Sequence, residues 1–153
     1  MLAQSVSQPE RFNELTQSEA VVDSPQPGKK SRFKVLVVDD DPLVRWSVSE
    51  TLTERGFEVA EAPDASSALR VLSQGGISVV LLDLRLPDSD DLRLLSAMRQ
   101  LKPSTAVILM TSFGDPELLE TAKRLGAFET VDKPFEIRDI VPLVEHAAAS
   151  LHL

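Results

Sequence analysis

From residue 33 onward, short apolar runs alternate with longer segments in which apolar residues recur every three or four positions. A short continuous apolar run is typical of a strand buried on both faces, and the longer spacing is typical of an amphipathic helix. The pattern therefore predicts five strands, at Phe33–Val38, Phe57–Glu61, Ile77–Leu82, Thr105–Met110 and Phe128–Val131.

Capping signals mark the helices that connect these strands. Aspartates at the starts and glycines at the ends are typical helix boundaries, and proline is favoured at the first helical position. The first helix is expected after Asp41 and ends at Arg55, and the second is expected after Asp64 and ends before Gly75. The other three are expected from about Asp90 to Leu101, after Asp115 to Leu125, and from about Glu136 to Ser150. In the first helix we expect a buried stripe formed by Leu43, Val44, Val48 and Leu52.

Five strand–helix units in about 120 residues indicate an α/β fold with helices on both faces of a parallel sheet. Right-handed crossovers leave few topologies, and we predict a flavodoxin-like, doubly wound, five-stranded sheet of order 2-1-3-4-5 with five helices. Residues 1–32 are rich in Ser, Gln, Glu and Pro, so we expect a flexible N-terminal tail, with the folded domain at 33–153.

Polar residues follow four of the apolar runs. Asp39 and Asp40 follow the first, Asp83 the third and Thr111 the fourth, and Lys133 comes shortly after the fifth. Because the carboxyl ends of parallel strands share one edge, these side chains are expected to meet in one pocket. At ~4 Å and an effective dielectric near 20, each pair of carboxylates repels by about 4 kcal/mol. A hard divalent cation offsets such repulsion, and Mg²⁺ suits a site completed by water and a phosphoryl oxygen.

This residue set indicates magnesium-dependent phosphoryl transfer. Asp83 is the predicted nucleophile toward phosphorus, Asp40 is predicted to bind Mg²⁺ directly, and Asp39 is predicted to bind it through water. Lys133 would supply positive charge to the phosphoryl oxygens, and Thr111 would donate its hydroxyl to the acyl phosphate. The acidic loop after the first strand argues against a flavin or a dinucleotide, which binds at a glycine-rich loop.

Composition excludes several other functions. The net charge of −8 gives no attraction to the DNA backbone, so we expect no direct nucleic acid binding by this chain. The absence of cysteine excludes disulfides, thiolate zinc sites and thiol catalysis. No apolar stretch approaches the ~20 residues of a membrane span, and the first residues lack the pattern of a signal peptide. We therefore expect a cytoplasmic protein with no membrane association.

Four stretches resemble the receiver domains of two-component response regulators, and the resemblance runs from about Phe33 to Ser150. The stretches are Val35–Asp41, Leu81–Pro87, Met110–Ser112 and Lys133–Phe135. Two further stretches, Asp41–Trp46 and Gly126–Phe128, are similar to receivers of nitrogen-regulatory transcription activators, which implies a role in transcription regulation. Whether the chain is a stand-alone receiver or a fragment of a longer regulator stays open.

The resemblance implies that a sensor histidine kinase phosphorylates Asp83 with Mg²⁺, and that a downstream effector or output domain responds. It implies a metal site formed by Asp40, Asp83 and the backbone carbonyl of Arg85, and a cis peptide bond between Lys133 and Pro134. The protein would be no enzyme toward other substrates and would catalyse only its own aspartyl phosphorylation and dephosphorylation.

Two departures from the family pattern leave alternatives open. Thr130 stands where receivers often carry an aromatic residue, and three acids (Asp88, Asp90, Asp91) occupy a loop where glycine is common. The acids could disfavour an anionic donor or add outer-shell metal binding.

The alternative function is a phosphorylation-independent protein-interaction module with a receiver fold. A homodimer through the face of the fourth helix, the fifth strand and the last helix is common in the family.

Overall fold

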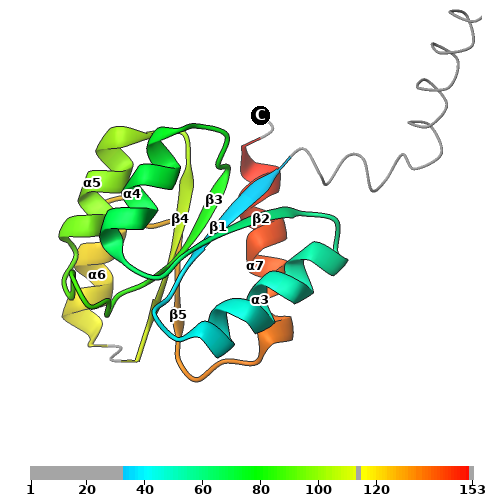
Figure 1. Ribbon diagram of the computed structural model, residues 1–153. Helices are drawn as coiled ribbons and strands as arrows, with labels where there is room; N and C mark the ends of the chain where they lie inside the picture. Colours follow the sequence, from blue (N-terminus) through cyan, green and yellow to red (C-terminus); the bar gives the residue numbers. More distant parts are fainter. Residues whose placement is uncertain (1–32, 113–114, 152–153) are drawn as a thin grey trace, which may run out of the picture.

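The computed structural model describes residues 33–112 and 115–151, which form a five-stranded parallel sheet with helices on both faces (Figure 1). The strands are β1 (Lys34–Val38), β2 (Glu58–Ala62), β3 (Val79–Asp83), β4 (Ala106–Thr111) and β5 (Glu129–Asp132). The helices are α3 (Pro42–Glu54), α4 (Ala65–Ser73), α5 (Arg93–Leu101), α6 (Pro116–Arg124) and α7 (Ile137–Ser150). The strand order is β2-β1-β3-β4-β5, which confirms the predicted topology. The predicted flexible tail, residues 1–32, lies outside the described residues.

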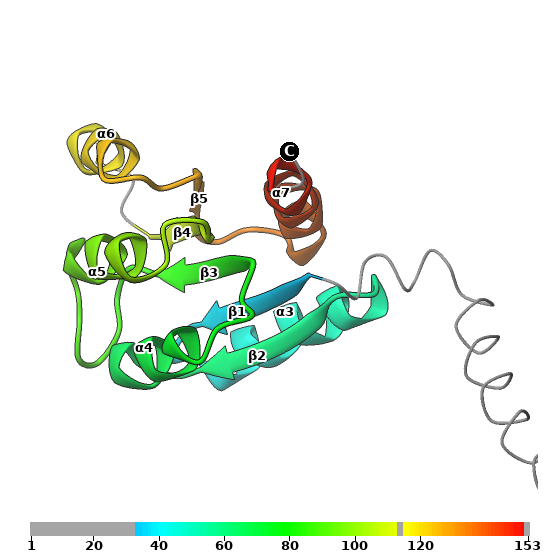
Figure 2. The same ribbon diagram turned by 90° about the horizontal axis from the view of Figure 1, so that it is seen from above.

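Alternate residues of the central strands pack on opposite faces of the sheet. On β1, Leu36 and Val38 belong to the core cluster that includes residues of α4, α5 and α6, whereas Val35 and Val37 belong to the cluster that includes residues of α3 and α7. Figure 2 shows these two groups of helices on either side of the sheet. Because side chains alternate along a strand, a strand covered on both faces must be apolar throughout. This requirement explains the continuous apolar runs.

Strands β3 and β4 extend one residue further than predicted. Asp83 pairs with Met110, and Thr111 pairs with Asp132, so both polar residues are the last members of the ladder. Asp39 directly follows β1, and its N–H donates to the carbonyl of Ala62 at 3.2 Å. The backbones of these functional candidates are therefore held by the sheet itself.

The predicted caps are present. The side chains of Asp41, Asp64 and Asp115 accept hydrogen bonds from the first-turn N–H groups of α3, α4 and α6. Gly56 and Gly126, with φ of 94° and 105°, follow α3 and α6 in a conformation that residues with a Cβ rarely adopt. Among the described residues, every helix is too short or too polar to cross a membrane.

Two local predictions were wrong. Leu43 is 68% exposed because it lies with Trp46 and Glu50 on the outer face of α3, opposite the buried face of Val48 and Leu52. Helix α5 begins at Arg93 and not at Asp90. The preceding residues form a separate turn, and the side chain of Asp91 accepts a hydrogen bond from the N–H of Arg93 at 2.9 Å, which favours a non-helical start.

Candidate functional site

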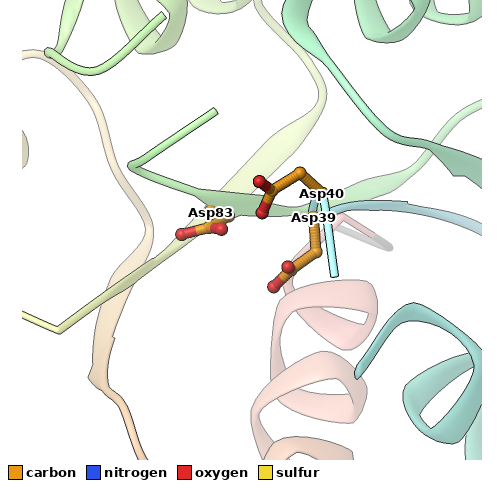
Figure 3. Close-up of side chains that lie close together, drawn as sticks. All are labelled: Asp39, Asp40 and Asp83. Carbon is orange, nitrogen blue, oxygen red and sulfur yellow. The ribbon is translucent and has the colours of Figure 1, made fainter. Parts of the chain in front are cut away.

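Three carboxylates converge where the adjacent strands β1 and β3 end. Asp39, Asp40 and Asp83 each offer a carboxylate oxygen, and these oxygens lie within 4.8 Å of one another. Asp39 and Asp83 are buried, whereas Asp40 is exposed. Figure 3 shows the carboxylate of Asp40 extending toward that of Asp83, with the carboxylate of Asp39 below both in this view. The predicted meeting of these residues is confirmed.

Asp39 uses all of its polar groups in bonds to the protein. Besides its N–H, its Oδ1 accepts from the N–H of Asp41 at 2.9 Å, and its Oδ2 accepts from Nζ of Lys133 at 2.8 Å. Its backbone carbonyl accepts from Nη1 of Arg45 at 2.7 Å. Both carboxylate oxygens thus already have donors within the protein, and the water-mediated contact of Asp39 with a metal ion stays a prediction.

Lys133 connects two of the three carboxylates. Its Nζ lies 2.8 Å from Oδ2 of Asp39 and 3.4 Å from Oδ2 of Asp83. Its N–H donates to the carbonyl of Thr111 at 2.8 Å, and its peptide bond with Pro134 is cis, as expected. Burial lowers the pKa of Lys133, but the hydrogen bond with Asp39 and the charges of Asp83 and Asp39 outweigh this effect and raise the pKa overall.

The surroundings of Asp83 disfavour the ionised form of its carboxyl group. Burial raises the pKa of Asp83, and the nearby charge of Asp39 raises it further. The charge of Lys133 and the N–H of Arg85, which lies 3.2 Å from Oδ1, act in the opposite direction without cancelling this rise. Added positive charge would therefore stabilise the ionised site. Clustered carboxylate oxygens are the ligands that Mg²⁺ prefers, so the donor set fits this ion.

The strands that lead to Thr111 and Lys133, β4 and β5, lie on the other side of β3 from β1. Thr111 is buried at the end of β4, the strand next to β3. A cleft opens beside Lys133, between the start of α3 and the loop that follows β5. It is lined by Asp41, Val44, Ser112, Lys133, Pro134, Phe135 and Ile137. The sheet thus brings all the predicted site residues to one edge.

Sequence reasoning missed Arg45. Its guanidinium binds the carbonyl of Asp39 and also forms an ion pair with Glu61 at 3.2 Å, so it ties the acidic loop to β2. A basic residue one turn into the helix that follows an acidic loop was the available signal. The sequence pattern gave no indication that the side chain of Arg45 would reach back to the end of β1.

Two of the three acids in the loop after β3 accept hydrogen bonds from backbone N–H groups. Asp88 accepts hydrogen bonds from the N–H groups of Ala65 and Ser66, and Asp91 accepts one from Arg93. Asp88 thus binds the start of α4, and Asp91 binds the start of α5. The group of carboxylates among the described residues that could hold a metal ion directly does not include them. Outer-shell metal binding by this loop stays a prediction.

Comparison with known proteins identifies the fold and the family together. The sequence model of the response regulator receiver domain matches residues 35–145. The chain belongs to the response regulator receiver domain family. A receiver domain protein from Methanospirillum hungatei has 26% identical residues and a TM-score of 0.75, with 79% of this chain and 97% of that one covered. This receiver domain is accordingly a component of two-component signal transduction.

The curated relatives include transcription regulators and a sporulation phosphotransferase. The receiver domain is 35% identical to the DNA-binding transcriptional regulator NtrC of Proteus hauseri over 74% of this chain and 24% of NtrC. It is 31% identical to sporulation initiation phosphotransferase F of Bacillus subtilis over 70% of this chain and 86% of that protein. It spans about a quarter of the length of the NtrC-type regulators that it matches.

Proposed function

We propose that this cytoplasmic receiver domain accepts a phosphoryl group on Asp83 from a sensor histidine kinase with Mg²⁺. The phosphorylated state then alters the binding of a downstream effector or output domain. The observation that supports this proposal most is the meeting of three carboxylates within 4.8 Å at a strand edge where Lys133 bridges Asp39 and Asp83.

Each residue has a distinct role in the proposed transfer. Asp40, Asp83 and the backbone carbonyl of Arg85 would hold Mg²⁺, with Asp39 contributing through water. When bound, the ion neutralises charge on the phosphoryl oxygens. A carboxylate oxygen of Asp83 attacks phosphorus, and the bond from phosphorus to the donor atom breaks as the new P–O bond forms.

Two residues stabilise the charge that the transfer brings into the site. Lys133, which is 3.4 Å from Asp83 before the reaction, offers its ammonium group to the phosphoryl oxygens. Thr111, buried at the end of the neighbouring strand, donates its hydroxyl to the acyl phosphate. The exposure of Asp40 and the cleft between α3 and the loop after β5 support approach of the phosphoryl donor from this side.

The test is phosphoryl uptake from acetyl phosphate with Mg²⁺, measured by intact mass on the wild type, Asp83→Asn and Asp41→Asn. Asp41 is the matched control because it is an adjacent carboxylate that caps α3. We expect one phosphoryl group on the wild type and on Asp41→Asn, and none on Asp83→Asn. Lys133→Ala should still bind Mg²⁺ but lose the response to phosphorylation. Retention of the group on Asp83→Asn would contradict the assignment.

The alternative, a phosphorylation-independent interaction module, draws its support from Thr130. This residue pairs with Leu109 in the β4–β5 ladder and provides no aromatic ring for coupling to Thr111. If Mg²⁺ binds and the donor modifies another receiver, yet this protein takes up no phosphoryl group, the alternative is favoured. A homodimer through α6, β5 and α7 is a further proposal, which sedimentation with and without the phosphoryl donor tests.

A further inference from the structure

The loop between β3 and α5 is fastened to the N-terminus of α4 by the side chain of Asp88. Its Oδ1 accepts from the N–H of Ala65 at 2.7 Å, and its Oδ2 accepts from the N–H of Ser66 at 3.1 Å. These first helical N–H groups have no acceptor within the helix, and the local cap Asp64 binds the next one, at Ser67. The helix dipole adds a further attraction for the carboxylate. Figure 2 shows the loop passing beside α4.

A short series of bonds connects Asp88 to the peptide group of Arg85. The N–H of Leu86 donates to the carbonyl of Ser89 at 2.8 Å, and the N–H of Ser89 donates back to Leu86 at 3.2 Å, which closes a tight turn around Asp88. The carbonyl of Arg85 and the N–H of Leu86 belong to one planar trans peptide group. The bond that orients the N–H of Leu86 therefore also orients the carbonyl of Arg85.

The start of the loop is held independently of Asp88. The N–H of Arg85 donates to Oδ1 of Asp83 at 3.2 Å, and the N–H of Leu84 donates to the carbonyl of Met110 at 2.9 Å. The side chains of Leu84 and Leu86 are buried in the core cluster that includes Ala65. The carbonyl of Arg85 thus lies between a start anchored on the sheet and a turn anchored on α4.

We propose that Asp88 is a positioning residue for the magnesium site. By holding the turn of residues 86–89 against α4, it sets the direction in which the carbonyl of Arg85 is presented beside Asp83. The inference rests on the proposed function, in which that carbonyl is a metal ligand. It assigns to Asp88 a role in ion affinity in addition to its role as a helix cap.

The experiment compares Asp88→Ala, Asp88→Asn and Asp90→Ala in the full chain. Asp90→Ala removes the same charge from the same exposed loop and is the matched control. Calorimetry measures the Kd for Mg²⁺, and acetyl phosphate uptake is followed as a function of Mg²⁺ concentration. We expect Asp88→Ala to raise the Kd about tenfold, the lower end of the effect of losing a group that orients a metal ligand. The control should change it by less than about twofold at ~0.15 M salt, where exposed charges are screened.

The dependence of phosphoryl uptake on Mg²⁺ concentration distinguishes a positioning role of Asp88 from a catalytic one. In Asp88→Ala the half-saturating Mg²⁺ concentration should rise with the Kd, while the maximal rate at saturating Mg²⁺ should return to the wild-type value. Asp88→Asn keeps one oxygen acceptor and should lie between the wild type and Asp88→Ala. Hydrogen exchange at the N–H of Leu86 should be faster in Asp88→Ala than in the control.

Urea unfolding in EDTA completes the test, because a helix cap alone would change stability without changing ion affinity. If Asp88→Ala is less stable but binds Mg²⁺ as the control does, the inference is wrong. If Asp88→Ala does not fold, Asp88→Asn provides the same comparison. If the wild type itself neither binds Mg²⁺ nor takes up the phosphoryl group, the proposed function fails, and the inference fails with it.

Discussion

Replacement of Lys133 by methionine should destabilise the protein strongly when no divalent ion is present. Methionine retains most of the apolar length of lysine but removes the ammonium group. Nζ lies 2.8 Å from Asp39 and 3.4 Å from Asp83, and the side chain of Asp39 is completely buried. The substitution therefore leaves two buried carboxylates next to each other without their cation.

The expected cost is about 3 kcal/mol. At an effective dielectric near 20, the ammonium attracts each carboxylate by about 5 to 6 kcal/mol at these distances. Its own desolvation offsets much of that gain, and removing one partner of a buried ion pair costs about 3–5 kcal/mol. We take the lower end because the side chain of Lys133 is still 19% exposed. Its pKa is raised above the ordinary 10.5, so the contribution is complete at pH 7 and is lost only as the pH rises through the folded-state value.

Urea unfolding at pH 7 in EDTA measures this cost. With a slope of about 1.5 kcal/mol per molar, the midpoint should fall by about 2 M. Lys123→Met is the matched control, since this exposed lysine lies on α6 and its loss should cost no more than about 0.5 kcal/mol. Added Mg²⁺ should stabilise Lys133→Met more than the wild type, because the ion replaces part of the missing charge.

A double-mutant cycle with Asp39→Asn tests whether the ion pair between Lys133 and Asp39 is the source of this cost. If the ion pair is the source of the cost, Lys133→Met should be much less harmful in the Asp39→Asn background. Equal costs in the two backgrounds, or a midpoint in EDTA no lower than that of Lys123→Met, would show that the bridging geometry does not stabilise the fold.

Three further outcomes are expected. Asp83→Asn should raise the urea midpoint in EDTA, because burial and the charge of Asp39 disfavour the ionised carboxylate. Added Mg²⁺ should narrow the difference in midpoint between this variant and the wild type. A midpoint in EDTA below that of the wild type would contradict this account. Asp40→Asn should weaken Mg²⁺ binding at least about tenfold, whereas Asp41→Asn should leave it nearly unchanged by calorimetry. The hydrogen bonds from Ser67 lower the pKa of Asp64, so its stabilisation is present above the ordinary value of 3.8 and is lost as the pH falls through the folded-state value. Asp64→Asn should therefore flatten the acid limb of stability measured by urea unfolding between about pH 5 and 2.

Local patterns predicted most of the fold because they reflect requirements within a single segment. A strand covered on both faces must be apolar throughout, so β1, β3 and β4 were visible as continuous runs. Asp41, Asp64 and Asp115 cap N–H groups two or three residues away, which makes them readable from sequence spacing alone. The predicted start of α5 was wrong because the preceding turn competes with the helix for the same backbone groups.

The amino-acid sequence by itself determined the elements, their order and the polar residues at the ends of four strands. The tertiary structure decided which of these residues touch. Lys133 reaches Asp39 across 94 positions, and Asp88 caps a helix that begins 23 positions earlier, because the strand order and the loop path bring these segments together. The raised pKa of Asp83 likewise needs the fold, since desolvation and Coulomb interactions depend on distances in space.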